Sequence, residues 1–198
     1  MSRTIDYYFA TISPYAYLGH DRFVAIAQKH GATVAVKPIN IGEVFPVSGG
    51  LPLSKRAPQR QAYRLVELAR WSQYLNKPMT IQPRFFPVNG DLAAYWILAA
   101  SELGSTQALA LAGAVGRAIW EQDRNIADAA TMQAIALECG LPAALAARAQ
   151  APEIAEKYAA LTREAIARGV FGAPTYVVED ELFWGQDRLD FLDRKMAK

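Results

Sequence analysis

Cysteine is nearly absent from this sequence. Cys139 is the single cysteine among 198 residues. A disulfide framework needs pairs of cysteines, and a CxxC redox centre needs two of them close together, so the composition excludes both. A lone thiol before a glycine, at the end of a predicted helix, is most simply a small buried hydrophobe.

Long apolar runs and a large excess of one charge are also missing. No stretch approaches the roughly 20 apolar residues that cross a bilayer, and the first residues lack the basic lead and apolar core of a signal peptide. Charged residues make up 20% of the chain and the net charge is +2, which does not indicate nucleic acid or an anionic membrane as a partner. We therefore expect a cytoplasmic protein.

The N-terminal part of the chain is typical of a β-α-β unit. Apart from Asp6, residues 5–9 are β-branched or aromatic, as in a buried strand. Ser13 and Pro14 follow as an N-cap residue and a proline at the first helical position. We expect this helix to reach about residue 30, and residues 33–37 to form a second strand, parallel to the first.

The central part predicts a block of helices. Residues 42–58 are rich in proline and glycine, and residues 76–90 are rich in proline. We expect irregular loops in both ranges. Between the loops, the helix predicted over 60–75 has its large apolar residues on one side: Leu65, Leu68, Trp71 and Leu75. Alanine-rich segments predict the remaining helices, at about 91–103, 106–122, 128–139, 142–149 and 152–168.

The C-terminal part returns to strands. Residues 176–178 and 182–184 predict two strands, and Asp187 is a candidate N-cap for a last helix to about residue 196. The whole order predicts an α/β protein with a thioredoxin-like fold and a large α-helical insertion. The thioredoxin-like domain would comprise residues 1–41 and 169–198, and the inserted helical domain residues 42–168.

Two places in this plan carry candidate chemistry. Thioredoxin folds put their reactive group at the N-terminus of the first helix, and this chain has Ser13 there. They also place a proline, typically cis, before the third strand and opposite that helix, and this chain has Pro174 there. We therefore expect Ser13 and Pro174 to face each other.

At these residues the sequence resembles the 2-hydroxychromene-2-carboxylate isomerases, relatives of kappa-class glutathione transferases and of DsbA-like oxidoreductases. The resemblance spans nearly the whole chain in the right order and implies a DsbA-like variant of the thioredoxin fold. The matching stretches are residues 6–9, 13–18, 58–63, 67–71, 85–87, 169–175 and 183–189.

The resemblance implies glutathione as the cofactor and Ser13 as the catalytic residue. A free thiol has a pKa of about 8.5, and lowering it by two units takes roughly 2.7 kcal/mol. A helix N-terminus contributes about 0.3–2 kcal/mol towards an anion, and a hydroxyl donor roughly 1.5–3 kcal/mol. Together these effects reach the required size, so Ser13 can activate a borrowed thiol.

The resemblance also implies a reaction and a set of binding residues. The thiolate would add to the opened chromene, allow rotation about the former double bond, and leave again, which interconverts 2-hydroxychromene-2-carboxylate and trans-o-hydroxybenzylidenepyruvate without a metal. A homodimer is implied as well. The glutathione contacts would be Ser13, Ala173, Pro174, Trp184, Gly185, Gln186 and Asp187. The contacts to the aromatic carboxylate would be Lys55, Arg60, Phe85 and Phe86.

Two other functions stay open at this point. One is a kappa-like glutathione transferase that acts on other electrophiles and consumes glutathione. The other is a non-catalytic DsbA-like binding module that holds peptides at the Pro174 edge. Thermal protection by glutathione would argue against the module.

Several of these residues also have plain structural interpretations. Ser13 before Pro14 and Asp187 before the last helix are ordinary caps, and Phe85 and Phe86 are good core residues. The run of basic residues over 55–70 is typical of a solvated helix face, from which we select Arg60 and not Arg64. His20 and His30 lie too far along the first helix to be assumed bases.

Overall fold

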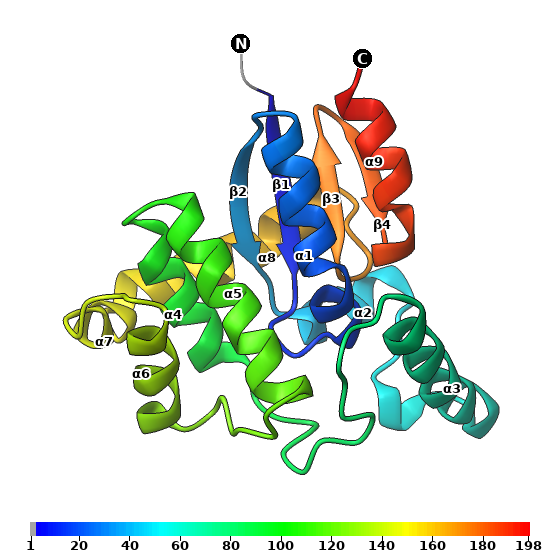
Figure 1. Ribbon diagram of the computed structural model, residues 1–198, viewed down its shortest axis with the longest axis horizontal. Coiled ribbons are helices and arrows are strands. Elements are labelled where there is room, and N and C mark those ends of the chain that lie inside the picture. Colours follow the sequence, from blue (N-terminus) through cyan, green and yellow to red (C-terminus); the bar gives the residue numbers. More distant parts are fainter. Residues whose placement is uncertain (1–2) are drawn as a thin grey trace.

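The sheet has four strands in the order β2-β1-β3-β4. The computed structural model describes residues 3–198 and places β1 at Thr4–Phe9, β2 at Thr33–Pro38, β3 at Thr175–Val178 and β4 at Glu181–Trp184. β1 pairs with β2 in parallel and with β3 antiparallel, and β3 pairs antiparallel with β4. This mixed sheet, with α1 (Pro14–Lys29) crossing between β1 and β2, confirms the predicted thioredoxin-like fold (Figure 1).

The two faces of the sheet form separate cores because successive side chains of a strand point to opposite sides. On one face, Tyr7 and Phe9 of β1 and Tyr176 of β3 pack against α1 and the helical block. On the other, Tyr8 and Val177 pack against α2 (Ile41–Ser48) and α8 (Pro152–Ala167). Buried β-branched and aromatic residues thus make these short strands stable.

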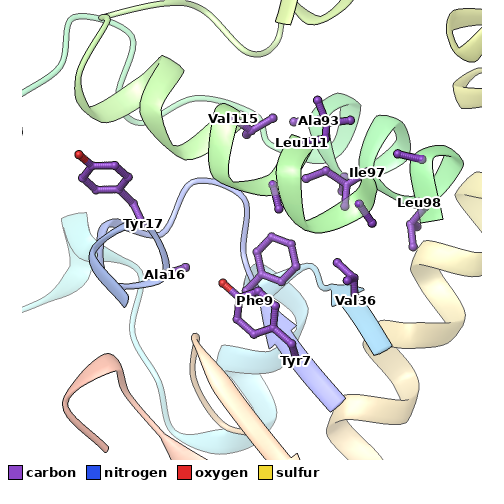
Figure 2. Close-up of a cluster of buried hydrophobic side chains, with 14 of the residues drawn as sticks. Tyr7, Phe9, Ala16, Tyr17, Val36, Ala93, Ile97, Leu98, Leu111 and Val115 are labelled. Carbon is purple, nitrogen blue, oxygen red and sulfur yellow. The ribbon is translucent and has the colours of Figure 1, made fainter. Parts of the chain in front are cut away.

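The first face is dominated by stacked aromatic rings. The Tyr7 ring lies 4.5 Å from Phe9, 4.6 Å from Phe23 and 5.4 Å from Tyr176, measured between centroids. Figure 2 shows Tyr7 and Phe9 on the side of β1 that faces Ile97 and Leu111 of the helical block. The sheet and the helical block therefore share one continuous core.

The helical block consists of α3 (Pro58–Tyr74), α4 (Asp91–Ser101), α5 (Ser105–Trp120), α6 (Ala129–Glu138) and α7 (Leu145–Ala149). α4 lies at its centre, in contact with α5, α7 and α8. α5 lies against α1, where Gly113 faces His20 and Gly116 faces Tyr17. A Cβ on Gly113 would come within 2.8 Å of the His20 ring, so the helices approach this closely only because of the glycine.

The prediction of an irregular loop over 42–58 is wrong. Residues Ile41–Ser48 form α2 and Leu53–Lys55 form a short 3-10 helix, η1. The Asn40 side chain caps α2 by accepting a hydrogen bond from the backbone N–H of Gly42 (3.0 Å), and Val44 is fully buried against the second core. The cap and this burial outweigh Pro46, which removes one hydrogen bond from the helix.

The last helix also begins differently from the prediction. Asp187 does not cap it but lies within a 3-10 turn, η2 (Gln186–Arg188), and α9 follows at Leu189–Met196. The predicted domain division at residues 41/42 and 168/169 stays a prediction. Among the helices of residues 3–198, none combines the length and the apolar character that crossing a bilayer requires.

Candidate active site

Ser13 is the N-cap of α1, at the end of β1. Its backbone is extended (φ −74°, ψ 122°), and its Oγ accepts a hydrogen bond from the backbone N–H of Ala16 at 3.2 Å. Pro14 occupies the first helical position and has no N–H to satisfy. The hydroxyl therefore lies at the positive end of a 16-residue helix, among first-turn N–H groups that no carbonyl within the helix can reach.

Ala173 and Pro174 lie across from Ser13, although 160 positions separate Ser13 from Ala173 in the chain. The Ala173–Pro174 peptide bond is cis, as the sequence predicts. The Ser13 hydroxyl donates to the Ala173 carbonyl over 3.4 Å, which is long for such a bond. Within residues 3–198, the backbone N–H of Ala173 donates no hydrogen bond. Ala173 therefore offers an unused backbone donor beside the Ser13 hydroxyl.

The end of β4 lies beside this pair. The backbone N–H of Gly185 donates to the Pro174 carbonyl at 2.9 Å, and Trp184 is the register partner of Thr175. The Trp184 ring covers Gly172, where an added Cβ would lie 2.2 Å from the indole nitrogen. Trp184 itself is 52% exposed. The fold thus brings four predicted glutathione contacts to the neighbourhood of Ser13: Ala173, Pro174, Trp184 and Gly185.

Gln186 and Asp187 follow in η2 and differ in exposure. Gln186 is 2% exposed, and its side-chain oxygen accepts a hydrogen bond from Arg22 at 3.3 Å. Asp187 is exposed and forms an ion pair of 2.8 Å with Arg188. Of the two side chains, the Asp187 carboxylate is therefore the one that a ligand can reach.

Tyr15, in the first turn of α1, is a residue that the sequence analysis missed. It is half-buried, and burial raises the pKa of its hydroxyl. The charges of Arg64 and Glu67 on α3 and of Asp187 in η2 also act on this hydroxyl. Tyr15 is therefore a polar group at the start of α1 that responds to charges on both α3 and η2.

One basic residue of α3 departs from the solvated face that the sequence predicts. Lys55 and Arg60 are exposed, and neither side chain forms a hydrogen bond or ion pair within residues 3–198. Arg64, which the sequence analysis set aside, is 9% exposed. A signal was available, because Arg64 precedes the fully buried Leu68 by one helical turn and so falls on the inner side of α3.

Phe85 and Phe86 lie in the loop that leads from α3 to α4. Phe85 is half-buried beneath the guanidinium of Arg84, 4.4 Å from its ring centroid. Phe86 is half-buried against Trp120, with 5.0 Å between the ring centroids, and the Phe86–Pro87 bond is cis. The contacts that the predicted binding residues make with ligands stay predictions.

His20 lies on the buried side of α1, away from the hydroxyl of Ser13. Burial lowers the pKa of His20 to about 4. Its ring is therefore neutral near pH 7 and packs against α5. Cys139 is a free, half-buried cysteine whose thiol has its pKa raised by burial, which keeps it protonated.

Comparison with known proteins agrees with this geometry. The family model of the DSBA-like thioredoxin domain matches residues 4–197. A 2-hydroxychromene-2-carboxylate isomerase of Sphingobium xenophagum is 32% identical over 195 residues, which covers 98% of this chain and 97% of the relative. The chain belongs to the 2-hydroxychromene-2-carboxylate isomerase family.

Two further relatives of the family are similar to this chain. A solved structure of a 2-hydroxychromene-2-carboxylate isomerase superimposes with a TM-score of 0.80 at 29% identity and covers 98% of this chain and 94% of that one. Glutathione S-transferase kappa 1 of Caenorhabditis elegans is 33% identical over 82 residues, covering 41% of this chain and 36% of that protein. The isomerase likeness thus extends over the full chain, whereas the transferase likeness covers a part of it.

Proposed function

We propose that this protein is a glutathione-dependent 2-hydroxychromene-2-carboxylate isomerase of aromatic catabolism, with Ser13 as its catalytic residue. The observation that carries the proposal is the position of the Ser13 hydroxyl, at the N-terminus of α1 and 3.4 Å from the carbonyl that precedes cis Pro174. The full-length similarity to isomerases supports this reaction over that of a transferase.

The environment of Ser13 suits a thiolate. Its hydroxyl proton is held only by the long contact to the Ala173 carbonyl, so it can turn to an anion at little cost. The positive end of α1 adds to the attraction. Ser13 itself keeps its proton and acts as a hydrogen-bond donor.

The residues around Ser13 fit a tripeptide. The free N–H of Ala173 can pair with the backbone of its cysteinyl residue, as a neighbouring strand would. The Asp187 carboxylate can accept from the γ-glutamyl ammonium, and the exposed Trp184 ring can cover the chain between them. Gln186 contributes through its backbone N–H, because Arg22 already donates to its side-chain oxygen at 3.3 Å and to its carbonyl at 3.4 Å.

When bound, glutathione supplies a thiolate that adds reversibly to a conjugated carbon and so permits rotation about the former double bond. The chain's own residues hold the reactants for this step. Phe85 and Phe86 are proposed to flank the aromatic ring of the substrate, and Lys55 and Arg60 to attract its carboxylate as it enters.

The test follows the fate of glutathione. Purified protein is given 2-hydroxychromene-2-carboxylate and a tenfold smaller amount of glutathione, and both are followed by chromatography. We expect complete approach to equilibrium with the free thiol unchanged, because the thiolate is released in each turnover. Glutathione consumed in proportion to substrate would identify a transferase instead.

A second measurement separates catalysis from the binding-module alternative. Glutathione at millimolar concentration should raise the melting temperature, since a ligand that binds the folded state stabilises it. Absence of any shift would argue for the module. We also propose that the protein is a homodimer and that it is cytoplasmic, where reduced glutathione is available. The molar mass from light scattering tests the first point, and cell fractionation tests the second.

A further inference from the structure

Arg64 is a buried cation without an anionic partner. The side chain lies on the inner side of α3, and the residue is 9% exposed. It forms no hydrogen bond or ion pair with any of residues 3–198. Arginine is almost never buried to this extent without a partner, because a charge removed from water loses its hydration.

Two aromatic rings hold the guanidinium of Arg64 in place. Its central carbon lies 5.3 Å from the ring centroid of Phe86 and 6.0 Å from that of Trp120. Stacking of this kind covers the faces of the planar group and leaves the N–H donors around its edge. The guanidinium is therefore oriented before any ligand arrives, and its N–H groups are available as hydrogen-bond donors.

The guanidinium of Arg64 lies near the start of α1. α3 contacts α1, and Figure 1 shows α3 beyond the end of the sheet at which α1 begins. The loop that carries Phe86 is tied to the same end, because the Thr11 hydroxyl donates to the Gly90 carbonyl at 3.0 Å. The charge of Arg64 also acts on the hydroxyl of Tyr15, two positions after Ser13.

We infer that Arg64 binds the carboxylate of the aromatic substrate and so determines which electrophiles the site accepts. The inference rests on the proposed function, which supplies an aromatic carboxylate. The planar guanidinium matches a carboxylate with two parallel hydrogen bonds, and the adjacent, half-buried Phe86 ring can contact the substrate's arene. The exposed Lys55 and Arg60 would attract the carboxylate as it enters, and Arg64 would then bind it inside the site.

The test uses two unreactive probes, 3-phenylpropanoate and its neutral amide, with binding measured by calorimetry in the presence of glutathione. We expect the wild-type protein to prefer the carboxylate. Arg64→Met should weaken binding of the carboxylate at least 20-fold and change binding of the amide less than threefold. The matched control Arg70→Met changes an exposed arginine of the same helix, which pairs with Glu67 at 3.1 Å, and should change either affinity less than threefold.

Stability provides an independent readout. Because Arg64 has no ion pair to lose, we expect Arg64→Met to melt no lower than the wild-type protein. Arg64→Lys keeps the charge without the planar fork and should recover part of the carboxylate preference. A fall of the melting temperature in Arg64→Met with equal loss of both probes would overturn the inference, since it would show a purely structural residue.

Glutathione affinity separates this inference from the proposed function. We expect the same glutathione affinity in the wild-type protein and Arg64→Met. A selective loss of glutathione affinity in the variant would assign Arg64 to the tripeptide and overturn the inference while leaving the proposed function intact. Failure of the wild-type protein to bind glutathione would instead overturn the proposed function, with the response of the two probes still deciding the role of Arg64.

Discussion

The two sides of the candidate site differ in what positions them. On the thioredoxin side, backbone groups define the site: the first turn of α1, the Ala173 carbonyl and the backbone N–H of Gly185. On the α3 side, side chains define it, with the Arg64 guanidinium stacked on Phe86. The fold dictates the first arrangement, whereas the second depends on how individual side chains pack.

This difference bears on specificity. A backbone cradle would hold the tripeptide that the proposed function requires, and it changes little when surface residues change. A stacked arginine, by our inference, would recognise one feature of the second substrate, and a single mutation removes it. We therefore expect variants on the thioredoxin side to affect all reactions of the protein, and variants on α3 to affect the choice of electrophile.

The largest effect is expected at Ser13. Ser13→Ala removes the hydroxyl donor and should reduce turnover by one to three decades, roughly 1.4–4 kcal/mol. The loss of the cap should cost about 1 kcal/mol of stability. The control is Asp128→Ala, which removes the cap of α6, where the carboxylate accepts from the Thr131 N–H at 2.7 Å. Both variants should melt slightly lower, and unchanged turnover in Ser13→Ala would remove Ser13 from the mechanism.

The contact between α1 and α5 should respond to pH through His20. The unfolded chain takes up a proton near pH 6.5, whereas the folded protein resists it until about pH 4, because His20 is buried. Stability is therefore complete above pH 6.5 and is lost as the pH falls towards 4, by about 3 kcal/mol. Chemical denaturation at several pH values measures this loss.

The variant His20→Gln tests the source of that loss. Asp21, Lys77 and Arg117 are the charged groups that act on His20, and all three remain in the variant. We expect a shallower loss of stability between pH 6.5 and 4 in His20→Gln than in the wild-type protein. Identical slopes in the wild-type protein and the variant would show that carboxylates alone cause the acid sensitivity.

A smaller effect is expected at Asp187. Asp187→Ala should weaken glutathione binding about tenfold, about 1.4 kcal/mol, because the γ-glutamyl ammonium loses its anionic partner. Calorimetry measures the affinity directly. Asp190→Ala is the matched control: its carboxylate is exposed and pairs with Arg22 at 3.3 Å, on the following helix. Equal affinities for the two variants would place the ammonium elsewhere.

The smallest effect is expected at Arg60. An exposed cation is screened by solvent and contributes little to binding, so Arg60→Gln should lower kcat/KM for the carboxylate substrate by two- to threefold. Raising the salt concentration should reduce this difference further. A loss of 20-fold or more would move the main carboxylate contact from Arg64 to Arg60.

Much of the thioredoxin side could be predicted from the sequence. The strand patterns, the Ser13-Pro14 helix start and the position of Pro174 depend on local residue preferences and on the order of elements. The α2 helix could not, because its stability comes from the burial of Val44 against α8, far along the chain, which outweighs its glycine and proline. Local propensity contains no information on such a contact.

Arg64 shows the same limit for the site. Its charge favours the interpretation as a solvated face, and only its spacing from Leu68 indicates the inner side of α3. Which of several arginines is buried depends on Phe86 and Trp120, which come from a loop and from another helix. The sequence therefore predicts a basic helix, and packing decides which residue of it faces the site.

The exposure of Trp184 provides an optical signal. The protein has four tryptophans, of which Trp96 and Trp120 are buried and Trp71 is half-buried, whereas Trp184 is 52% exposed. An indole that moves from water into a covered environment emits at shorter wavelength. A tripeptide that settles against this ring would thus shift the intrinsic fluorescence of the unlabelled enzyme, so occupancy of the cradle can be followed in real time.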